Sequence, residues 1–348
     1  MHKRRCSKEI RIGNISIGGD APIVVQSMTK TDTRNVKATS DQIRELAECG
    51  CEIVRLAVPD QEAAVALRKI KQNSPLPLIA DIHFDYRLAL TAMESNIDGL
   101  RLNPGNISDA DKVGKIVLAA RERAIPIRIG VNAGSLPPAR KKYKSKAEHM
   151  VDVTLQQVKF LEDLNFNLIK VSLKSFDIPT TVQAYRLIAS RIPYPLHLGI
   201  TEAGLPTSGM IRSAIGIGIL LFEGIGDTIR VSLSSHPREE VAAAWEILKS
   251  LNLRQRGVTI ISCPSCGRCE VDLIRIAQAV DRETASLNKN IRIAVMGCVV
   301  NGPGEAADAD IGIACGKGKG VVFKKGDILK TVPEKDLVSC LLHEIRSL

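Results

Sequence analysis

Aromatic residues and long apolar runs are both scarce in this chain of 348 residues. Phe, Trp and Tyr make up 3% of the sequence, too few for a surface that stacks the bases of single-stranded nucleic acid. No apolar stretch follows the N-terminal MHKRRCSKEI, so we expect no signal peptide. The longest apolar run, AIGIGILLF at 214–222, is too short to cross a bilayer. These absences predict a cytoplasmic protein that neither crosses a membrane nor binds nucleic acid.

Several cofactor-binding motifs are also missing. No GxGxxG opens a helix after the first predicted strand, no GxxxxGK[ST] occurs, and the radical-forming CxxxCxxC spacing is absent. The chain therefore carries no sequence signal for a nicotinamide or flavin of its own. Its 45% hydrophobic residues and net charge of +10 indicate a slightly basic enzyme with a sizeable core and an anionic partner.

One pattern recurs through the first two-thirds of the chain, after a predicted hairpin at 9–18. A short β-branched, apolar run ends in a polar residue, and a stretch with helical periodicity follows, as at 61–72 and 238–251. The runs cover 22–28, 52–58, 76–83, 97–105, 125–135, 168–175, 195–204 and 227–235. Strands that alternate with helices in this number predict a closed (β/α)8 TIM-type barrel. An open doubly wound sheet is the alternative.

The pattern stops near residue 250, and the rest of the chain predicts a small α+β domain. A strand at 257–262 runs into a cysteine motif, and the segments that follow are a helix at 271–286, strands at 291–297, 310–316 and 320–326, and a helix within 334–348. The GKGKG at 316–320 is typical of a hairpin turn, because no helix start follows it. We therefore place the barrel domain at 1–253 and the second domain at 254–348.

Cationic and polar residues occupy one face of the predicted barrel strands. Because side chains alternate along a strand, Arg55 shares a face with Ile53 and Ala57, while Leu, Ile and Val dominate the opposite face and must pack against the helices. The polar face points into the barrel, near the C-terminal strand ends where barrel enzymes have their active sites. It carries Arg55, Arg101, Asn103, Arg128, Asn132, Lys170, Ser172, Lys174, Arg230 and Ser232.

Acidic partners for these cations are few on the same strands, namely Asp81 after the third strand and Glu202 after the seventh. Guanidinium groups match phosphate geometry, so the surplus positive charge predicts a phosphorylated, and more specifically a diphosphorylated, small molecule. The alternative for a single Arg is a structural pair with a carboxylate from a loop. His83 beside Asp81 is a candidate for polar contact with the substrate, and Glu202 for a general acid or base or for a counter-charge.

The cysteines of SCPSCGRCE (262–270) and GCVVNGPGE (297–305) form a candidate metal site. Cys263, Cys266 and Cys298 supply three thiolates, and the fourth ligand could be Cys269, Glu305 or an exogenous molecule. Three thiolates with a weaker oxygen ligand suit a 4Fe-4S cluster with one accessible iron. A zinc ion held by four thiolates, including that of Cys269, is the alternative. A disulfide is disfavoured in a reducing compartment.

Several motifs together resemble the 4-hydroxy-3-methylbut-2-enyl diphosphate synthases, an iron–sulfur enzyme family of the methylerythritol phosphate route to isoprenoids. They are VQSMTKTDT, LRLNPGNI, IRIGVNAGSL, GITEAG, SCPSCGR and MGCVVNGPGEAADADIGIACG, and they occur in the family's order along essentially the whole chain. The last string is very specific, and the others add weight collectively. The length is that of the short, two-domain bacterial form.

The resemblance implies a TIM-type barrel followed by an iron–sulfur domain, and the reductive conversion of 2-C-methyl-D-erythritol 2,4-cyclodiphosphate to the allylic hydroxy-diphosphate. It implies a 4Fe-4S cluster held by Cys263, Cys266, Cys298 and Glu305, with Cys269 a spectator. The implied diphosphate contacts are Arg55, Arg101, Arg128, Lys174 and Arg230, with Asp81, His83, Asn103, Asn132 and Ser232 close by. Glu202 matches an acidic residue that assists proton transfer. The family further implies a homodimer in which the cluster domain of one subunit covers the barrel of the other.

Two other functions compete with a reductase that receives electrons from ferredoxin or flavodoxin. A cluster-dependent hydratase or lyase would use the open iron as a Lewis acid, without electron input. A zinc-stabilised binding module would have no chemistry and would bind an anion such as nucleic acid through its positive charge. Turnover that depends on a reductant would distinguish the reductase from the hydratase or lyase. A colourless, zinc-loaded protein would favour the zinc-stabilised binding module.

Overall fold

The computed structural model describes residues 2–83, 85–102, 110–139, 141–269, 271–285, 287, 289–298, 306 and 308–348. The chain divides into two compact units, Met1–Arg254 and Gln255–Leu348. The predicted boundary lies one residue before this division. No helix of the described part is both long and apolar enough to cross a membrane.

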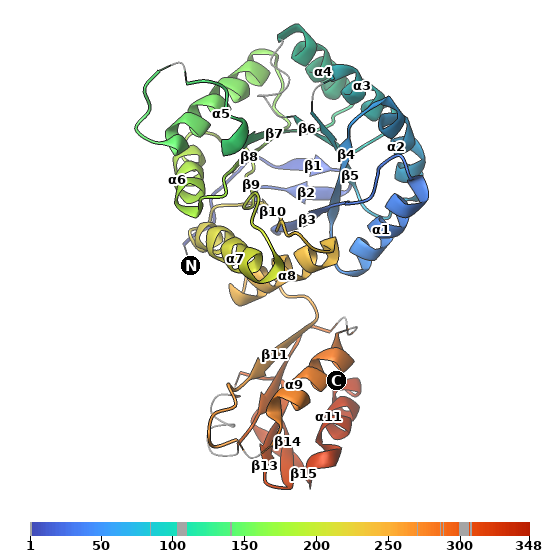
Figure 1. Cartoon of the computed structure of the whole chain (residues 1–348), viewed down its shortest axis with the longest axis vertical. Helices are drawn as coiled ribbons and strands as arrows, with labels where there is room; N and C mark the ends of the chain where they lie inside the picture. Colours follow the sequence, from blue (N-terminus) through green and yellow to red (C-terminus); the bar gives the residue numbers. More distant parts are fainter. Residues whose placement is uncertain are drawn as a thin grey trace. The chain divides into compact units, whose positions relative to one another are not determined.

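The first unit is a parallel barrel, and the predicted (β/α)8 fold is confirmed (Figure 1). Its strands are β3 (Val24–Met28), β4 (Ile53–Val58), β5 (Leu78–Ile82), β6 (Gly99–Leu102), β7 (Ile127–Asn132), β8 (Ile169–Lys174), β9 (His197–Leu198) and β10 (Thr228–Ile229). They pair in the order β8-β7-β6-β5-β4-β3-β10-β9. A single parallel bridge, Val171 to Leu196, joins β8 to the segment before β9 and closes the ring, which excludes the open sheet.

The seam between β8 and β9 is reinforced by a side chain. Tyr185 is fully buried, and its hydroxyl accepts a hydrogen bond from Leu173 N (3.2 Å) while it donates to the carbonyl oxygen of His197. The phenol therefore replaces part of the missing backbone ladder between these two strands.

Eight helices of the described part surround the strands (Figure 1). They are α1 (Val36–Glu48), α2 (Gln61–Asn73), α3 (Tyr86–Glu94), α4 (Ala110–Glu122), α5 (Lys146–Asp163), α6 (Ile178–Ala189), α7 (Pro206–Phe222) and α8 (Pro237–Ser250). The start of α2 illustrates the local cause, since the Asp60 carboxylate accepts a hydrogen bond from Ala63 N (2.9 Å) as an N-cap. Pro206 and Pro237 open α7 and α8, where a missing backbone N–H costs nothing.

The N-terminal hairpin, β1 (Ile10–Ile12) and β2 (Ile15–Ile17), packs against the apolar end of the barrel interior. Its isoleucines form one buried cluster with Val24, Ile53 and Ile79, the first inward-facing residues of three strands. The next inward-facing residues along these strands are polar or charged. The polypeptide thus closes the N-terminal end of the barrel with apolar side chains and leaves the cationic layers at the other end.

The second unit is a five-stranded mixed sheet with two described α-helices. β11 (Val258–Ser262), β12 (Ile291–Met296) and β13 (Ile311–Gly316) are parallel, and β14 (Lys319–Lys324) and β15 (Asp327–Pro333) run antiparallel. Helices α9 (Leu273–Thr284) and α11 (Leu337–Arg346) pack on a shared core. The predicted hairpin turn joins β13 and β14, while the sequence interpretation missed β15, an exposed edge strand with few buried positions to give an alternating pattern.

Candidate functional site at the barrel mouth

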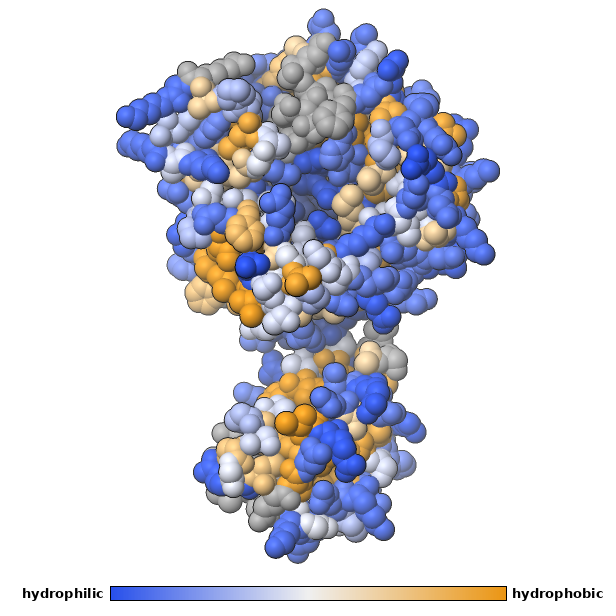
Figure 2. Space-filling view, viewed as in Figure 1, coloured by the Kyte–Doolittle hydropathy of each residue, from blue (hydrophilic) through white to orange (hydrophobic). Residues whose placement is uncertain are grey.

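A cavity of about 420 Å³ lies within the C-terminal layers of the barrel. It is lined by Met28, Arg55, Asp81, His83, Arg101, Arg128, Asn132, Ser135, Lys174, Thr201, Arg230 and Ser232. In Figure 2 the centre of the barrel is hollowed and lined by hydrophilic residues. Nine of the ten predicted substrate-binding residues line this cavity, and the tenth, Asn103, lies outside the described residues.

Asp81 joins two arginines and a histidine of the cavity. Its carboxylate lies 3.1 Å from Arg101 Nη1, 3.5 Å from Arg55 Nε and 3.4 Å from His83 Nε2, and its side chain is only 4% exposed. Burial alone would raise the pKa of Asp81, but the charge of Arg55, the hydrogen bond from His83 and the charge of Arg101 hold it well below its usual range. Asp81 is therefore an anion at neutral pH and balances part of the positive charge.

Arg128 is buried and remains short of hydrogen-bond acceptors. Its Nη1 donates to Ser172 Oγ (2.6 Å), while its Nε and Nη2 have no partner among the described residues. Burial, then Arg55 and Arg101, lowers the pKa of Arg128 well below its usual range. A buried donor without an acceptor is costly, so these N–H groups favour a ligand with several oxygens.

Gly130 makes room for two of the guanidinium groups. An added Cβ at this inward-facing position would lie 2.9 Å from Arg101 Nε and 3.4 Å from Arg128 Nη1. A side chain here would displace one of the two arginines, so the cationic layer depends on a residue that carries no charge itself.

Arg230 has a carboxylate partner that the sequence interpretation missed. Glu240 of α8 is 1% exposed, and its Oε2 lies 3.3 Å from Arg230 Nη2. Its Oε1 also accepts from Leu233 N (3.0 Å) and lies 3.1 Å from Lys30 Nζ. A structural pair was the alternative for any single arginine, and for Arg230 it holds in part, with the partner on a helix rather than on a loop.

Glu202 differs from the other predicted site residues. It is exposed, lies outside the set that lines the cavity, and has a positive φ of 55°. Its neighbour Thr201 lines the cavity instead. The alternation that identified the arginines also places His197, Gly199 and Thr201 on the inward face, so it could have identified Thr201 and assigned Glu202 to the opposite face.

The cysteine motif follows the C-terminal end of β11, and Cys298 follows that of the adjacent parallel strand β12. Gly297 N donates to Cys263 Sγ (3.3 Å), and an added Cβ at Gly297 would lie 2.6 Å from Cys269 Sγ. Cys266 is exposed, and hydrogen bonds from the backbone and side chain of Arg268 lower its pKa. The thiols of Cys263 and Cys269 thus both lie beside Gly297, the residue that precedes Cys298.

The donor set at these strand ends fits an iron–sulfur cluster in its chemistry, because thiolates are the usual ligands of such clusters. Within the described residues, no group of three or more His, Cys, Asp or Glu side chains is gathered closely enough to hold a metal ion. Glu305, the predicted oxygen ligand, lies outside the described residues. Burial raises the pKa of Cys315 to about 12, which keeps this neighbouring thiol protonated and unsuited to ligation.

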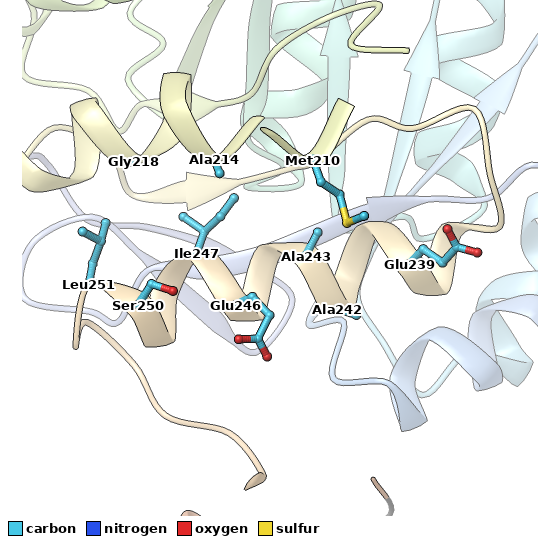
Figure 3. A pocket seen from close by; sticks show the side chains of 10 residues that line it. All are labelled: Met210, Ala214, Gly218, Glu239, Ala242, Ala243, Glu246, Ile247, Ser250 and Leu251. Atoms are coloured by element: carbon cyan, nitrogen blue, oxygen red, sulfur yellow. The ribbon is translucent and has the colours of Figure 1, made fainter. Parts of the chain in front are cut away.

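A second hollow lies between α7 and α8 and is mainly apolar (Figure 3). Met210 and Ala214 of α7 and Ala243 and Ile247 of α8 line it. Exposed apolar residues also gather over α7, among them Ile211 and Phe222 (Figure 2). No lysine or arginine is among the residues that line this hollow, so the barrel mouth is the better candidate for binding an anion.

Comparisons with known proteins agree over both units. The family profile described as "GcpE TIM-barrel domain" matches residues 7–245, and "GcpE protein C-terminal domain" matches 259–347. The chain is 62% identical over 348 residues to a "4-hydroxy-3-methylbut-2-en-1-yl diphosphate synthase (flavodoxin)" of Dehalococcoides mccartyi, with 100% of both chains covered. It is 57% identical over 344 residues to the protein of that name from Geobacter sulfurreducens, with 98% of both covered.

Among solved structures, the dihydropteroate synthase of Yersinia pestis matches with a TM-score of 0.51 at 10% identity, over 70% of this chain and 98% of that one. At this identity the likeness supports the barrel fold alone.

Proposed function

The chain belongs to the GcpE family over both of its units, and from this premise we propose how its residues perform the family's reaction. The reaction is the two-electron reductive ring opening and dehydroxylation of 2-C-methyl-D-erythritol 2,4-cyclodiphosphate to 4-hydroxy-3-methylbut-2-enyl diphosphate, a step in the biosynthesis of isoprenoid precursors. The observation that carries the assignment is identity of 62% over the full length to a protein named for this product. The cationic cavity supports it independently.

The cyclic diphosphate would bind in the barrel cavity. Arg55, Arg101, Arg128, Lys174 and Arg230 present more positive charge than Asp81 and Glu240 balance. Guanidinium N–H groups without acceptors would donate to the phosphate oxygens. When the ring opens, the same groups would stabilise the negative charge on the freed phosphate. Asp81 would orient Arg55 and Arg101 for this contact.

Four residues of the second unit would hold a 4Fe-4S cluster, namely Cys263, Cys266, Cys298 and Glu305. When bound, such a cluster would supply the two electrons one at a time. Cys269 would be a spectator, although its thiol lies beside Gly297. Glu202 would deliver or accept a proton as the oxygen leaves, at the edge of the cavity beside Thr201.

We extend the proposal to partners. The name of the relatives includes flavodoxin, so flavodoxin or a ferredoxin would supply the electrons. The chain would act in the cytoplasm as a homodimer whose active site is shared between subunits. The exposed apolar residues of α7 support an assembly, because exposed apolar patches mark interaction surfaces.

The test is anaerobic purification, iron and sulfide analysis, and turnover of the cyclodiphosphate with a strong artificial reductant. We expect a brown protein with bound iron and sulfide that turns over only when the reductant is present. Turnover without reductant would favour the non-redox hydratase, and a colourless, zinc-loaded protein would overturn the cluster assignment. Cys6→Ser is a matched control for Cys298→Ser, since Cys6 is an exposed thiol of the barrel unit.

A further inference from the structure

Lys174, a residue of the cavity wall, contacts a histidine that sequence reasoning did not single out. Lys174 Nζ lies 3.2 Å from His197 Nε2, and His197 Nδ1 lies 2.8 Å from Thr228 Oγ1. The three side chains come from the neighbouring strands β8, β9 and β10. His197 and Thr228 are 0% exposed and Lys174 is 6% exposed. The histidine therefore lies beneath the cavity and out of reach of solvent.

The hydrogen-bonding capacity of the three groups fixes the protonation state of the ring. In its ammonium form Lys174 can only donate, and His197 Nε2 then accepts from it. The proton of a neutral imidazole then resides on Nδ1, which donates to Thr228 Oγ1. Burial, then the charges of Lys174 and Arg128, lowers the pKa of His197 well below its usual range, in agreement with a neutral ring.

The backbone around Lys174 and His197 is closely packed, and a glycine at position 199 leaves space for the lysine ammonium. An added Cβ at Gly199 would lie 2.7 Å from Lys174 Nζ and 2.5 Å from Arg230 O. The carbonyl oxygen of His197 accepts the hydroxyl proton of Tyr185, which fixes the backbone at the histidine. Burial, then the charges of Arg128 and Arg230, lowers the pKa of Lys174 well below its usual range, so the ammonium form needs an acceptor beneath it as well as an anion in the cavity.

We propose that His197 is a positioning residue, which acts as a neutral acceptor that fixes the Lys174 ammonium and directs its remaining N–H bonds into the anion cavity. Thr228 fixes the tautomer that makes this possible. His197 touches neither substrate nor cofactor and acts through Lys174. The inference rests on the proposed function only in taking the bound group to be a diphosphate.

The test measures binding of inorganic pyrophosphate to the full-length protein by calorimetry, which requires no turnover. Charge-assisted hydrogen bonds are worth enough that His197→Phe should weaken binding roughly tenfold or more. His197→Gln places Oε1 near the position of Nε2 and should stay within about threefold of the wild type. In a Lys174→Ala background, His197→Phe should have no further effect, because it acts through the lysine.

Equal losses in His197→Gln and His197→Phe, or a full additional loss on top of Lys174→Ala, would mean that the histidine is merely structural and would overturn the proposal. The ¹⁵N spectrum of the wild-type ring decides the matter even if the Phe variant does not fold, because the proposal requires the proton on Nδ1. A proton on Nε2 refutes it. Failure of the wild type to bind pyrophosphate would count against the proposed diphosphate function, and the ring tautomer would still test the histidine.

Discussion

Asp81→Asn separates the structural role of the acidic residue in the cavity from its electrostatic effect on the ligand. The substitution keeps the shape and removes the charge that lies 3.1 Å from Arg101 and 3.5 Å from Arg55. Breaking a buried ion pair by removing one partner costs about 3–5 kcal/mol. For a domain of this size, each kcal/mol corresponds to roughly 2–4 °C, so we expect Tm to fall by roughly 6–20 °C.

Pyrophosphate should restore more stability to the Asp81→Asn variant than to the wild type. The variant's cavity is more positive, and a ligand that binds only the folded state stabilises it by about 2.7 kcal/mol at one hundred times its Kd. Thermal unfolding with and without pyrophosphate, followed by circular dichroism, measures both effects. Asp41→Asn removes an exposed partner of Arg44 at 2.6 Å and should change Tm little.

The pH dependence follows from the direction of the pKa shift. Because the pKa of Asp81 is depressed in the folded state, its contribution is fully present above the unfolded pKa of about 3.9 and is lost as the pH falls toward the folded pKa. The stability difference between wild type and Asp81→Asn should therefore be constant from about pH 5 upward and shrink below about pH 4. Equal melting of the two proteins, or equal stabilisation by pyrophosphate, would refute the reasoning.

Three further outcomes are expected. Arg230→Ala should raise KM roughly ten- to hundredfold with a smaller change in kcat, because it would remove the charge-assisted contact that we propose between Arg230 and the substrate; an unchanged KM in steady-state assays would exclude Arg230 from the site. Gly199→Ala should weaken pyrophosphate binding in calorimetry, since the new methyl would lie 2.7 Å from Lys174 Nζ, and unaltered affinity would show that the lysine can move freely. Cys298→Ser should abolish iron retention while Cys269→Ser keeps it, and iron loss from both would make Cys269 a ligand.

The fold and most of the cavity could be predicted from strand alternation. Arg55, Arg101 and Arg128 lie on inward-facing positions of β4, β6 and β7, with Asp81 on β5 between the first two. This periodicity of two survives in the structure, since all three arginines line the cavity. The confirmed barrel follows from the same repeats. The alternation within each strand is sufficient to predict its inward-facing residues, because each strand packs its outward face against the helix that follows it.

Partners that come from distant elements could not be predicted in this way. Glu240 lies in the first turn of α8, where an acidic residue is ordinarily explained by the helix dipole, yet its side chain is buried against Arg230. His197 sits in a strand that is only two residues long, and its role depends on the spacing of three neighbouring strands. Such pairings depend on tertiary geometry, which single-strand periodicity does not contain.

One side of the barrel has fewer backbone hydrogen bonds between strands than the rest of the described barrel. Strands β9 and β10 have only two residues each, and a single bridge joins the segment before β9 to β8. Local breathing of the barrel should begin on this side, because amide groups with few ladder bonds exchange with solvent from the least stable openings. Lys174 ends β8 and Arg230 follows β10, so the two cations lie on either side of β9. An anion that bound both would link the two sides of this weakly hydrogen-bonded part of the barrel. Binding of an anion in the cavity should then slow amide exchange in β9 and β10.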